Sequence, residues 1–246
     1  MRLQGKTVIV TGGASGFGAG IVRKFVAEGA RVMIADLNAE AAARIAAETG
    51  GIAQQVDVAD GASVAAMAQA AVKAMSRIDI LVNNAGITHL PTPLEDVAED
   101  EFDRVFAVNC KSVYLTARAL VPQMKAAGAG AIINVASTAG LSPRPRLNWY
   151  NASKGWMITA TRTMAVELAP AGIRVNALCP VAGETPLLAS FMGEDTPEMR
   201  AKFLSTIPIG RFSTPEDLGN AACFLASDEA GMITGAALTV DGGRCI

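Results

Sequence analysis

Short runs rich in valine and isoleucine alternate with longer alanine-rich stretches along the 246-residue chain. The short runs are continuously apolar, which is typical of strands covered by helices on both faces. Strands and helices that alternate in this way form right-handed crossovers and a parallel sheet. The expected strands are Thr7–Val10, Arg31–Ile34, Ile52–Val56, Ile80–Val82, Ala131–Val135, Arg174–Leu178 and Ala237–Val240.

The expected helices lie between these strands, and no linker or repeat divides the chain. They are Gly16–Glu28, Ala39–Glu48, Gly61–Met75, Glu101–Ala126, Ser153–Ala169 and Pro215–Leu225. We therefore predict one doubly wound α/β domain over residues 1–246, with a parallel sheet of about seven strands. Residues 185–212 interrupt the alternation, and an insertion of that length is typical of a functional lid.

Composition excludes several classes of protein. The net charge of −2 leaves no basic surface for nucleic acid. No apolar run reaches the ~18 residues of a membrane span. The N-terminus enters a strand at once and leaves no room for a secretory signal, so we expect a cytoplasmic protein.

The cysteines and the single histidine argue against a metal site. Cys110, Cys179, Cys223 and Cys245 are far apart in the sequence, and His89 is the one histidine. Metal sites need several such ligands at close spacing, so we expect reduced, mostly buried thiols and no bound metal. A histidine-based triad would have to centre on His89, and no Gly-x-Ser-x-Gly motif accompanies it.

A glycine-rich segment follows the first expected strand and opens the first helix. It reads Thr11-Gly12-Gly13-Ala14-Ser15-Gly16-Phe17-Gly18. Glycines allow the backbone to approach a pyrophosphate, and the helix N-terminus offers free N–H groups to it. The alternative is a plain strand–helix turn, but its place in the first βα unit favours a nucleotide site.

Asp36 ends the second expected strand, 18 residues after Gly18. A carboxylate there can accept hydrogen bonds from the adenosine ribose and would repel a 2′-phosphate. Leu37 and Asn38 follow without a cation, and Ser15 occupies a loop position where a basic residue could meet that phosphate. We therefore predict NAD rather than NADP; the alternative is that Asp36 caps the helix starting near Ala39.

Two further strand ends offer contacts to the same cofactor. Asp57-Val58 follows the third strand, where a side-chain oxygen could meet an adenine amino group. Asn83-Asn84-Ala85-Gly86 ends the fourth strand, and its small and amide residues fit backbone packed against a cofactor. The alternative for this second segment is an ordinary turn.

Tyr150 and Lys154 stand four residues apart, on one face of a helix. A free tyrosine has a pKa of about 10. A positive charge about 4 Å away contributes about 4 kcal/mol at an effective dielectric of 20, which lowers that pKa by roughly three units. We therefore expect Lys154 to bring Tyr150 close to neutrality, where it can exchange a proton with an alcohol oxygen.

Ser137 and Asn109 are further polar candidates near this chemistry. Ser137 ends the fifth expected strand, at the sheet edge where ligands bind, and could hydrogen-bond the reacting oxygen; the alternative is a loop or capping serine. Asn109 interrupts a long helix and is a poor helix former, which indicates a kink or a held water; the alternative is an ordinary mid-helix residue.

Taken together, these residues resemble the short-chain dehydrogenase/reductase family in its short, single-domain Rossmann branch. The branch includes 3-oxoacyl-carrier-protein reductases and glucose or cyclic alcohol dehydrogenases. The resemblance covers almost the whole chain, including the last strand and its flanks, Ile233–Gly243. Its marks are Thr11-Gly12-x-x-x-Gly16-x-Gly18, Asp57, Asn83–Gly86, Asn109, Ser137 and Tyr150-x-x-x-Lys154.

The resemblance implies a catalytic tetrad. Tyr150 would be the acid/base, and Ser137 would orient the substrate oxygen. Lys154 would lower the tyrosine pKa and hold the nicotinamide ribose, and Asn109 would hold a water that links Lys154 to solvent. The resemblance also implies a homotetramer with one interface formed from about Pro215 to the C-terminus, where Cys245-Ile246 would be buried between subunits.

The segment Pro180-Val181-Ala182-Gly183-Glu184-Thr185 departs from the family pattern. The resemblance implies that Thr185 binds the nicotinamide carboxamide. The family usually places glycine directly after the proline, whereas this chain has Val181 and then Gly183. The expected cofactor-binding residues are Gly12, Ser15, Gly16, Phe17, Gly18, Asp36, Asp57, Val58, Asn84, Ala85, Gly86, Tyr150, Lys154, Pro180, Val181, Gly183 and Thr185.

The substrate is expected to lie against three segments: the one after Gly86, the loop Thr138–Trp149, and residues 185–212. Their candidate contacts are His89, Leu141, Arg144, Arg146, Asn148, Trp149, Leu187, Leu188 and Phe191. Arg144 and Arg146 could clamp a carboxylate or phosphate, or could lie on the surface. His89 fits a loop residue better than a catalyst.

We predict an NAD-dependent oxidoreductase (EC 1.1.1.-) for a small or cyclic secondary alcohol, or a polyol, and its ketone. A 3-oxoacyl-thioester reductase using NADP(H) is one alternative. Its acidic carrier protein would need cations near the site, and Lys125 and Arg174 are the nearest ones in the relevant segments. A non-catalytic NAD-binding regulator is a second alternative. An extended-type epimerase or dehydratase would need a larger substrate domain than this chain supplies.

Overall fold

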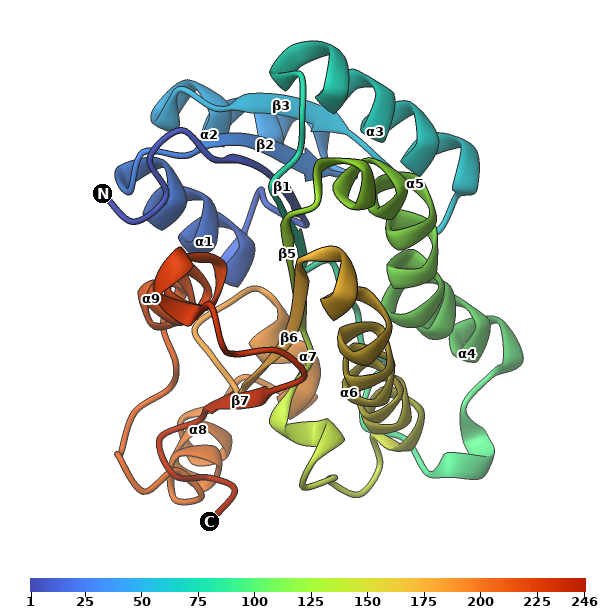
Figure 1. Cartoon of the computed structure of the whole chain (residues 1–246). Helices are drawn as coiled ribbons and strands as arrows, with labels where there is room; N and C mark the ends of the chain where they lie inside the picture. Colours follow the sequence, from blue (N-terminus) through green and yellow to red (C-terminus); the bar gives the residue numbers. More distant parts are fainter.

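Seven parallel strands form one sheet in the computed structural model of the chain, which describes residues 1–246. Their order across the sheet is β3-β2-β1-β4-β5-β6-β7. The expected doubly wound sheet of about seven strands is therefore confirmed (Figure 1). The strands are β1 (Thr7–Thr11), β2 (Arg31–Asp36), β3 (Ile52–Gln55), β4 (Ile80–Asn83), β5 (Gly130–Val135), β6 (Ile173–Pro180) and β7 (Ala237–Val240).

Helices cover both faces of this sheet. Side chains of α1, α2 and α9 pack on one face, and side chains of α3, α5 and α6 pack on the other. The α-helices are α1 (Gly16–Ala27), α2 (Ala39–Thr49), α3 (Gly61–Met75), α4 (Glu99–Phe106), α5 (Ser112–Ala127), α6 (Asn148–Leu168), α7 (Leu187–Met192), α8 (Pro197–Leu204) and α9 (Pro215–Ala226).

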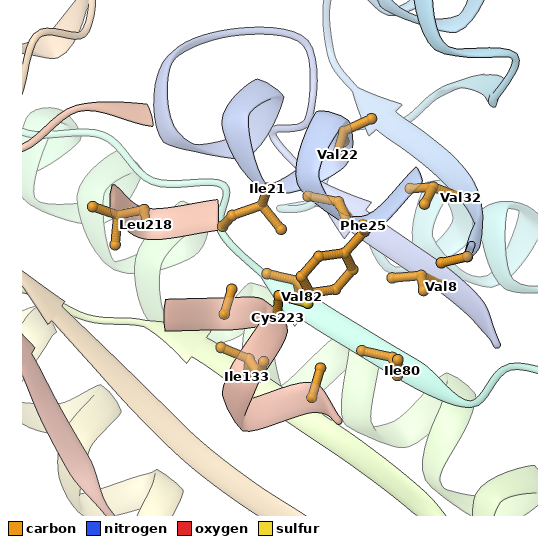
Figure 2. Close-up of a cluster of buried hydrophobic side chains, with 14 of the residues drawn as sticks. Val8, Ile21, Val22, Phe25, Val32, Ile80, Val82, Ile133, Leu218 and Cys223 are labelled. Atoms are coloured by element: carbon orange, nitrogen blue, oxygen red, sulfur yellow. The ribbon is translucent and has the colours of Figure 1, made fainter. Parts of the chain in front are cut away.

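Neighbouring residues of one strand enter different halves of the core. In β1, Val8 belongs to the cluster beneath α1 and α9, whereas Ile9 belongs to the cluster beneath α3 and α5. Figure 2 shows the first of these clusters, with Phe25 of α1 next to Val82 and Cys223 of α9 close by. Both faces of the central strands β1, β4, β5 and β6 are buried, which explains why their sequences show continuous apolar runs rather than alternation. The edge strands β3 and β7 are partly exposed.

The strand order places a crevice at the carboxyl edge of the sheet. The chain moves from β1 to β2 and β3 on one side, and then returns to β4 on the other side of β1. Loops that leave β1 and β4 therefore separate in opposite directions, and ligands of doubly wound folds bind at this switch point.

The insertion, defined as residues 185–212, contains α7 and α8 and has a small apolar core of its own. This core joins Leu188 and Met192 of α7 to Ile207 and Phe212, and it includes Val181 from the end of β6. Val181 is the residue that replaces the expected glycine, and it is 3% exposed. The substitution therefore supplies an apolar contact that fastens the insertion to the sheet.

Two helices differ by more than one residue from their expected limits. The helix expected over Glu101–Ala126 is divided by a π-helical segment, Ala107–Lys111, between α4 and α5. The irregularity anticipated at Asn109 is thus present, and π segments are frequent at functional sites. The helix expected to begin at Ser153 begins at Asn148, so the tyrosine and lysine of the motif both lie inside it.

None of the helices combines the length and the apolar character that crossing a membrane requires. The structure also contains no cluster of three or more His, Cys, Asp or Glu side chains arranged to hold a metal ion.

The contact between α1 and α9 depends on a glycine. A Cβ built on Gly20 would lie 2.2 Å from the carbonyl oxygen of Pro215. We expect Gly20→Ala to force the two helices apart and to lower the free energy of unfolding by about 2–3 kcal/mol, measured by urea denaturation.

The matched control is Gly155→Ala in α6, where the nearest atom to an added Cβ is a carbonyl oxygen 3.8 Å away. There alanine fits without a clash and should raise the stability by up to about 1 kcal/mol through its helix propensity. Equal effects of the two substitutions would contradict the packing argument.

Candidate active site

A cavity of 440 Å³ runs along the carboxyl edge of the sheet, from the ends of β2 and β3 to the insertion. This volume is within the range of small-molecule and cofactor sites. It collects most of the residues singled out from the sequence. Those that line it are Gly12, Ser15, Gly16, Phe17, Asp36, Asp57, Val58, Asn84, Ala85, Gly86, Ser137, Tyr150, Lys154, Pro180, Val181, Gly183 and Thr185.

The glycine-rich turn packs directly against the end of β4. Gly12 has a φ of +60°, and a Cβ built on it would lie 2.9 Å from the Cα atom of Ala85. A Cβ on Gly18 would lie 2.0 Å from the carbonyl oxygen of Gly12. Gly18 does not line the cavity, so its part is to let helix α1 approach the turn.

Two side chains hold this turn in place. Asn84 donates from Nδ2 to the carbonyl oxygens of Thr11 and Gly12, at 3.0 and 2.9 Å. Thr11 returns the contact, because its Oγ1 accepts from the amides of Asn84 and Ala85. The sequence analysis identified Thr11 only as part of a motif and not as a residue that holds the turn. The available signal for that role was its position at the end of β1, beside β4.

Helix α1 begins with its N-terminal amides available to an anion. Ser15 is the N-cap residue in an extended conformation, and its side chain forms no capping hydrogen bond. Gly16 has a φ of +49°, and a Cβ there would lie 3.1 Å from Thr185. A glycine-lined cradle at a helix N-terminus suits the pyrophosphate of a dinucleotide, so these residues fit such a group.

The Asp36 carboxylate lies at the β2 end of the cavity. It accepts hydrogen bonds from the amide of Ala14 at 3.0 Å and from the amide of Asn38 at 3.0 Å. The alternative that Asp36 caps the next helix is wrong, because Asn38 is the N-cap of α2 and its side chain accepts from Ala41. Asp36 instead ties the glycine-rich turn to β2 and presents its charge to the cavity.

Ser137 and Tyr150 meet near the middle of the cavity. Ser137 follows β5, and its Oγ accepts from the amide of Ala139 at 3.1 Å, so it caps a short turn and keeps its own proton to donate. Tyr150 is 4% exposed. Phe191 of the insertion lies edge-on to the tyrosine ring, with a centroid distance of 5.1 Å, and covers it from solvent.

Lys154 is buried and has one carbonyl partner. Its Nζ donates to the carbonyl oxygen of Val135 at 2.9 Å and lies 5.8 Å from the centroid of the Tyr150 ring. A Cβ on Gly86 would lie 3.2 Å from this Nζ, so glycine leaves space beside the ammonium group. Burial lowers the pKa of Lys154 to about 8.

The electrostatics of Tyr150 differ from the sequence expectation. Burial raises the pKa of Tyr150 to about 12, and the interactions with Ser137 and with the Arg144 charge lower it only in part. The expectation that Lys154 alone brings the phenol close to neutrality is therefore wrong. The reason is that desolvation of the phenolate outweighs the available charges, and Arg144 rather than Lys154 is the cation that acts on it.

Asn109 lies behind the cavity rather than in its wall. It is fully buried in the π segment. Its Oδ1 accepts from the amide of Ile87 at 2.9 Å, and its Nδ2 donates to the carbonyl oxygen of Ile87 and to Ser153 Oγ. Asn109 thus positions the loop after β4 beside Lys154; the water expected at its side chain remains a prediction.

Gly183 and Thr185 connect β6 to the insertion. A Cβ on Gly183 would lie 2.2 Å from the ring of Phe17, so glycine lets Phe17 pack against this segment. Thr185 donates its amide to the carbonyl oxygen of Gly183 at 2.8 Å and lines the cavity above Gly16. Glycine at position 183, rather than at position 181 as in the family pattern, thus allows Phe17 to pack against this segment.

The candidate substrate contacts divide into two groups. Arg144, Leu187 and Phe191 line the cavity. The other six do not line it, so the cavity gives no support to them as substrate contacts: His89, Leu141, Arg146, Asn148, Trp149 and Leu188. For His89 and Arg146 the structure agrees with the stated alternatives, a loop position and a surface position. His89 is buried, with Nδ1 bonded to the carbonyl oxygen of Leu90, and Arg146 is exposed.

Phe203 lines the cavity and was not anticipated. It lies in α8, four residues after Met199, and both side chains pack on the insertion core. This apolar pair at helical spacing was the signal available in the sequence. Ile87 and Leu147 complete the apolar wall near Tyr150.

Comparison with known proteins decides the family. Residues 12–244 match the family described as "Enoyl-(Acyl carrier protein) reductase", a group of short-chain dehydrogenases. The chain is 50% identical to 4-formylbenzenesulfonate dehydrogenase TsaC1/TsaC2 of Comamonas testosteroni, over 100% of both chains. This chain is a short-chain dehydrogenase/reductase. The expected family resemblance is therefore confirmed.

Other members of the family are similar over their full length. D-threitol dehydrogenase of Mycolicibacterium smegmatis is 41% identical, over 100% of this chain and 95% of the relative. A crystal structure of 3-ketoacyl-(acyl-carrier-protein) reductase from Brucella melitensis, complexed with NADH, is 49% identical. It superposes with a TM-score of 0.95 over 99% of this chain and 100% of that one. This dehydrogenase/reductase therefore shares the fold of a nicotinamide-binding oxidoreductase.

The buried ammonium of Lys154 should make the stability of the protein depend on pH. Between the lowered pKa of about 8 and the ordinary value of 10.5, the unfolded chain keeps a proton that the native state has lost. Stability from this residue therefore increases as the pH rises through that window. We expect the free energy of unfolding of the wild type, minus that of Lys154→Met, to rise by about 2 kcal/mol between about pH 7 and pH 10.

Lys111, an exposed lysine, provides the matched control. Lys111→Met should leave the pH profile of the wild type in place, measured by urea denaturation in the same buffers. A difference between wild type and Lys154→Met that stays flat across this window would contradict the assignment of a buried ammonium.

Proposed function

We propose that this chain transfers a hydride between NAD(H) and a small or cyclic secondary alcohol, or a polyol, and its carbonyl product. The observation that carries the proposal is the meeting of Tyr150, Ser137 and Lys154 in the cavity that the glycine-rich turn also lines. A phenol and a hydroxyl that line one cavity can hold and protonate a single substrate oxygen.

In this proposal the residues of the chain divide the proton chemistry. NAD(H) accepts or supplies the hydride, and its oxidised ring adds a positive charge that favours the phenolate form of Tyr150. Tyr150 gives its proton to the carbonyl oxygen in reduction and takes it from the alcohol in oxidation. Ser137 donates a hydrogen bond to the same oxygen, and Lys154 offers its ammonium group beside Gly86 for hydroxyls of the cofactor.

The choice of NAD over NADP rests on Asp36. Its carboxylate borders the cavity, and Leu37 beside it is exposed and uncharged. A 2′-phosphate would meet a negative charge there without a compensating cation. Asp57 and Val58 line the same end and are proposed to contact the adenine.

The substrate class is supported by relatives and by the cations of the chain. The relatives include D-threitol dehydrogenase and xylitol dehydrogenase, both named for polyol substrates. The alternative of a carrier-protein reductase needs cations free to meet an acidic partner. Arg174 instead donates to the carbonyl oxygens of Ile233 and Ser227, and Lys125 pairs with Glu167.

We also propose a cytoplasmic homotetramer. All four cysteines are free, which suits a reducing compartment. Large apolar side chains remain exposed on α6, at Trp156 and Val166, and near the C-terminus, at Met232 and Ile246. Exposed apolar side chains of this size support the burial of these surfaces between subunits.

Replacing the proposed acid/base tests the mechanism. Tyr150→Phe keeps the ring that packs on Phe191 and removes only the hydroxyl. We expect turnover of secondary alcohols with NAD to fall by at least about 10³-fold, measured by NADH absorbance, because the variant lacks the hydroxyl that is proposed to exchange the proton.

Binding of NADH to Tyr150→Phe, followed by fluorescence, should stay within a few-fold of the wild type. An unchanged NADH affinity would show that the variant is folded and that the loss of turnover is a loss of chemistry. Activity near the wild-type level would remove Tyr150 from the mechanism, and unchanged NADH binding with no turnover in the wild type itself would favour the regulator alternative.

A charge exchange at the end of β2 tests the cofactor preference. The double substitution Asp36→Ala with Leu37→Arg removes the repelling carboxylate and supplies a cation. We expect the ratio of kcat/KM for NADP over NAD to rise by about 100-fold or more.

The matched control is Leu37→Arg alone, which keeps the Asp36 carboxylate and its hydrogen bonds to Ala14 and Asn38. It should shift the ratio much less. An unchanged ratio in the double variant would mean that Asp36 does not face the ribose.

A further inference from the structure

The cavity carries an unneutralised positive charge at its substrate end. Four charged residues line it: Asp36 and Asp57 at the end that receives the adenosine, Lys154 in the middle, and Arg144 beside the insertion. Arg144 is half-buried, and its guanidinium group takes part in none of the salt bridges of the chain. A half-buried cation without an acidic partner favours an anionic ligand.

A second arginine increases this positive potential. Arg244 donates from Nη1 to Ser142 Oγ at 3.5 Å, its Nε is buried without a hydrogen-bond partner, and it forms no salt bridge. Burial and the Arg244 charge both lower the pKa of Arg144. Asp241 forms no salt bridge with either arginine, and its carboxylate accepts from the amides of Gly243 and Cys245.

Arg144 and Tyr150 face the same space. The Arg144 charge acts directly on the Tyr150 phenol, and both residues line the cavity. The guanidinium group lies over the ring of Phe203, 4.4 Å from its centroid. The rings of Phe191 and Phe203 and the side chain of Leu187 therefore form an apolar wall beside the two polar groups.

We propose that this cavity selects substrates that carry an oxyanion, a carboxylate or a sulfonate, held by Arg144 while an apolar body places the reacting carbon at Tyr150. The inference rests on the proposed function, because it names the substrate class of that same site. Arg144 is then a specificity-determining residue, and Arg244 supports it through its charge. The planar guanidinium group can donate two parallel hydrogen bonds to such a group.

A competing explanation is that Arg144 only fastens the insertion by stacking on Phe203. Phe203→Leu removes the stacked ring and keeps both arginines, so it separates this role from anion binding. If stacking is the whole role, Phe203→Leu and Arg144→Gln should have the same effect on every ligand.

Dead-end binding tests the anion site without turnover. Benzoate and benzamide have similar shapes and differ in charge, and each is titrated calorimetrically into the NADH-loaded protein. We expect the wild type to bind benzoate at least about 10-fold more tightly than benzamide, since charge-assisted hydrogen bonds contribute to one ligand alone. Arg144→Gln should abolish this preference, and Phe203→Leu should keep it.

Arg146→Gln is the matched control, because Arg146 lies two residues away and outside the cavity, bonded to the carbonyl oxygen of Pro91. It should keep the full preference for benzoate. Equal affinity for the two ligands in the wild type, no detectable binding of either, or an undiminished preference in Arg144→Gln would each overturn the proposal.

Turnover then separates this inference from the proposed function. Reduction of 4-acetylbenzoate and of 4-methylacetophenone by NADH is compared in the wild type and in Arg144→Gln, because both are ketones that yield secondary alcohols. A preference for the anionic ketone of at least about 10-fold, lost in the variant, supports both. Equal turnover of the two ketones overturns the anion site and leaves the proposed function in place. Preferential benzoate binding with no turnover of either ketone supports the anion site and contradicts the proposed function.

Discussion

The close approach of the β1–α1 turn to the end of β4 is the contact on which the carboxyl edge of the sheet depends. A Cβ on Gly12 would lie 2.9 Å from the Cα atom of Ala85, so a side chain at position 12 would collide with the segment after β4. Asn84 then bonds the turn to β4 through two carbonyl groups. This backbone contact brings the start of α1 and the loop after β4, which lies beside Lys154, to one crevice, where a dinucleotide can bridge them.

A second constraint is the burial of polar groups around the proton donor. Lys154, Asn109 and Ser153 are all buried, and each has hydrogen-bond partners within the protein. Desolvation disfavours the charged form of both titrating residues, so it lowers the pKa of Lys154 and raises the pKa of Tyr150. Tyr150 therefore holds its proton strongly until further positive charge enters the cavity, whereas Lys154 releases its proton more readily than an exposed lysine.

The sequence was sufficient for the sheet, most of the helices and the cofactor half of the cavity. These depend on local patterns: continuous apolar runs, glycines after β1 and an acidic residue after β2. The substrate half of the cavity was harder to predict, because part of its wall comes from α7 and α8. The position of these helices depends on tertiary packing and not on a local pattern. Phe203 and Arg144 meet across the cavity from segments far apart in the chain, and no local pattern reports such a pair. The tyrosine electrostatics were also beyond reach, because burial cannot be read from a four-residue spacing.

The π segment at Ala107–Lys111 limits where the chain can gain or lose residues. A π turn accommodates one residue more than an α turn, which rotates everything after it by about 100°. The stacked pair Phe102 and Phe106 before the segment and the buried Leu120 and Met124 after it are thus set to different phases. Loss of a single residue here would restore a regular helix and turn Asn109 away from Ile87. The aromatic pair before the segment and the buried pair after it could then no longer both keep their packing. The π segment therefore fixes the rotation of α5 relative to α4. We expect insertions and deletions to be tolerated in the loops around these helices rather than within the segment.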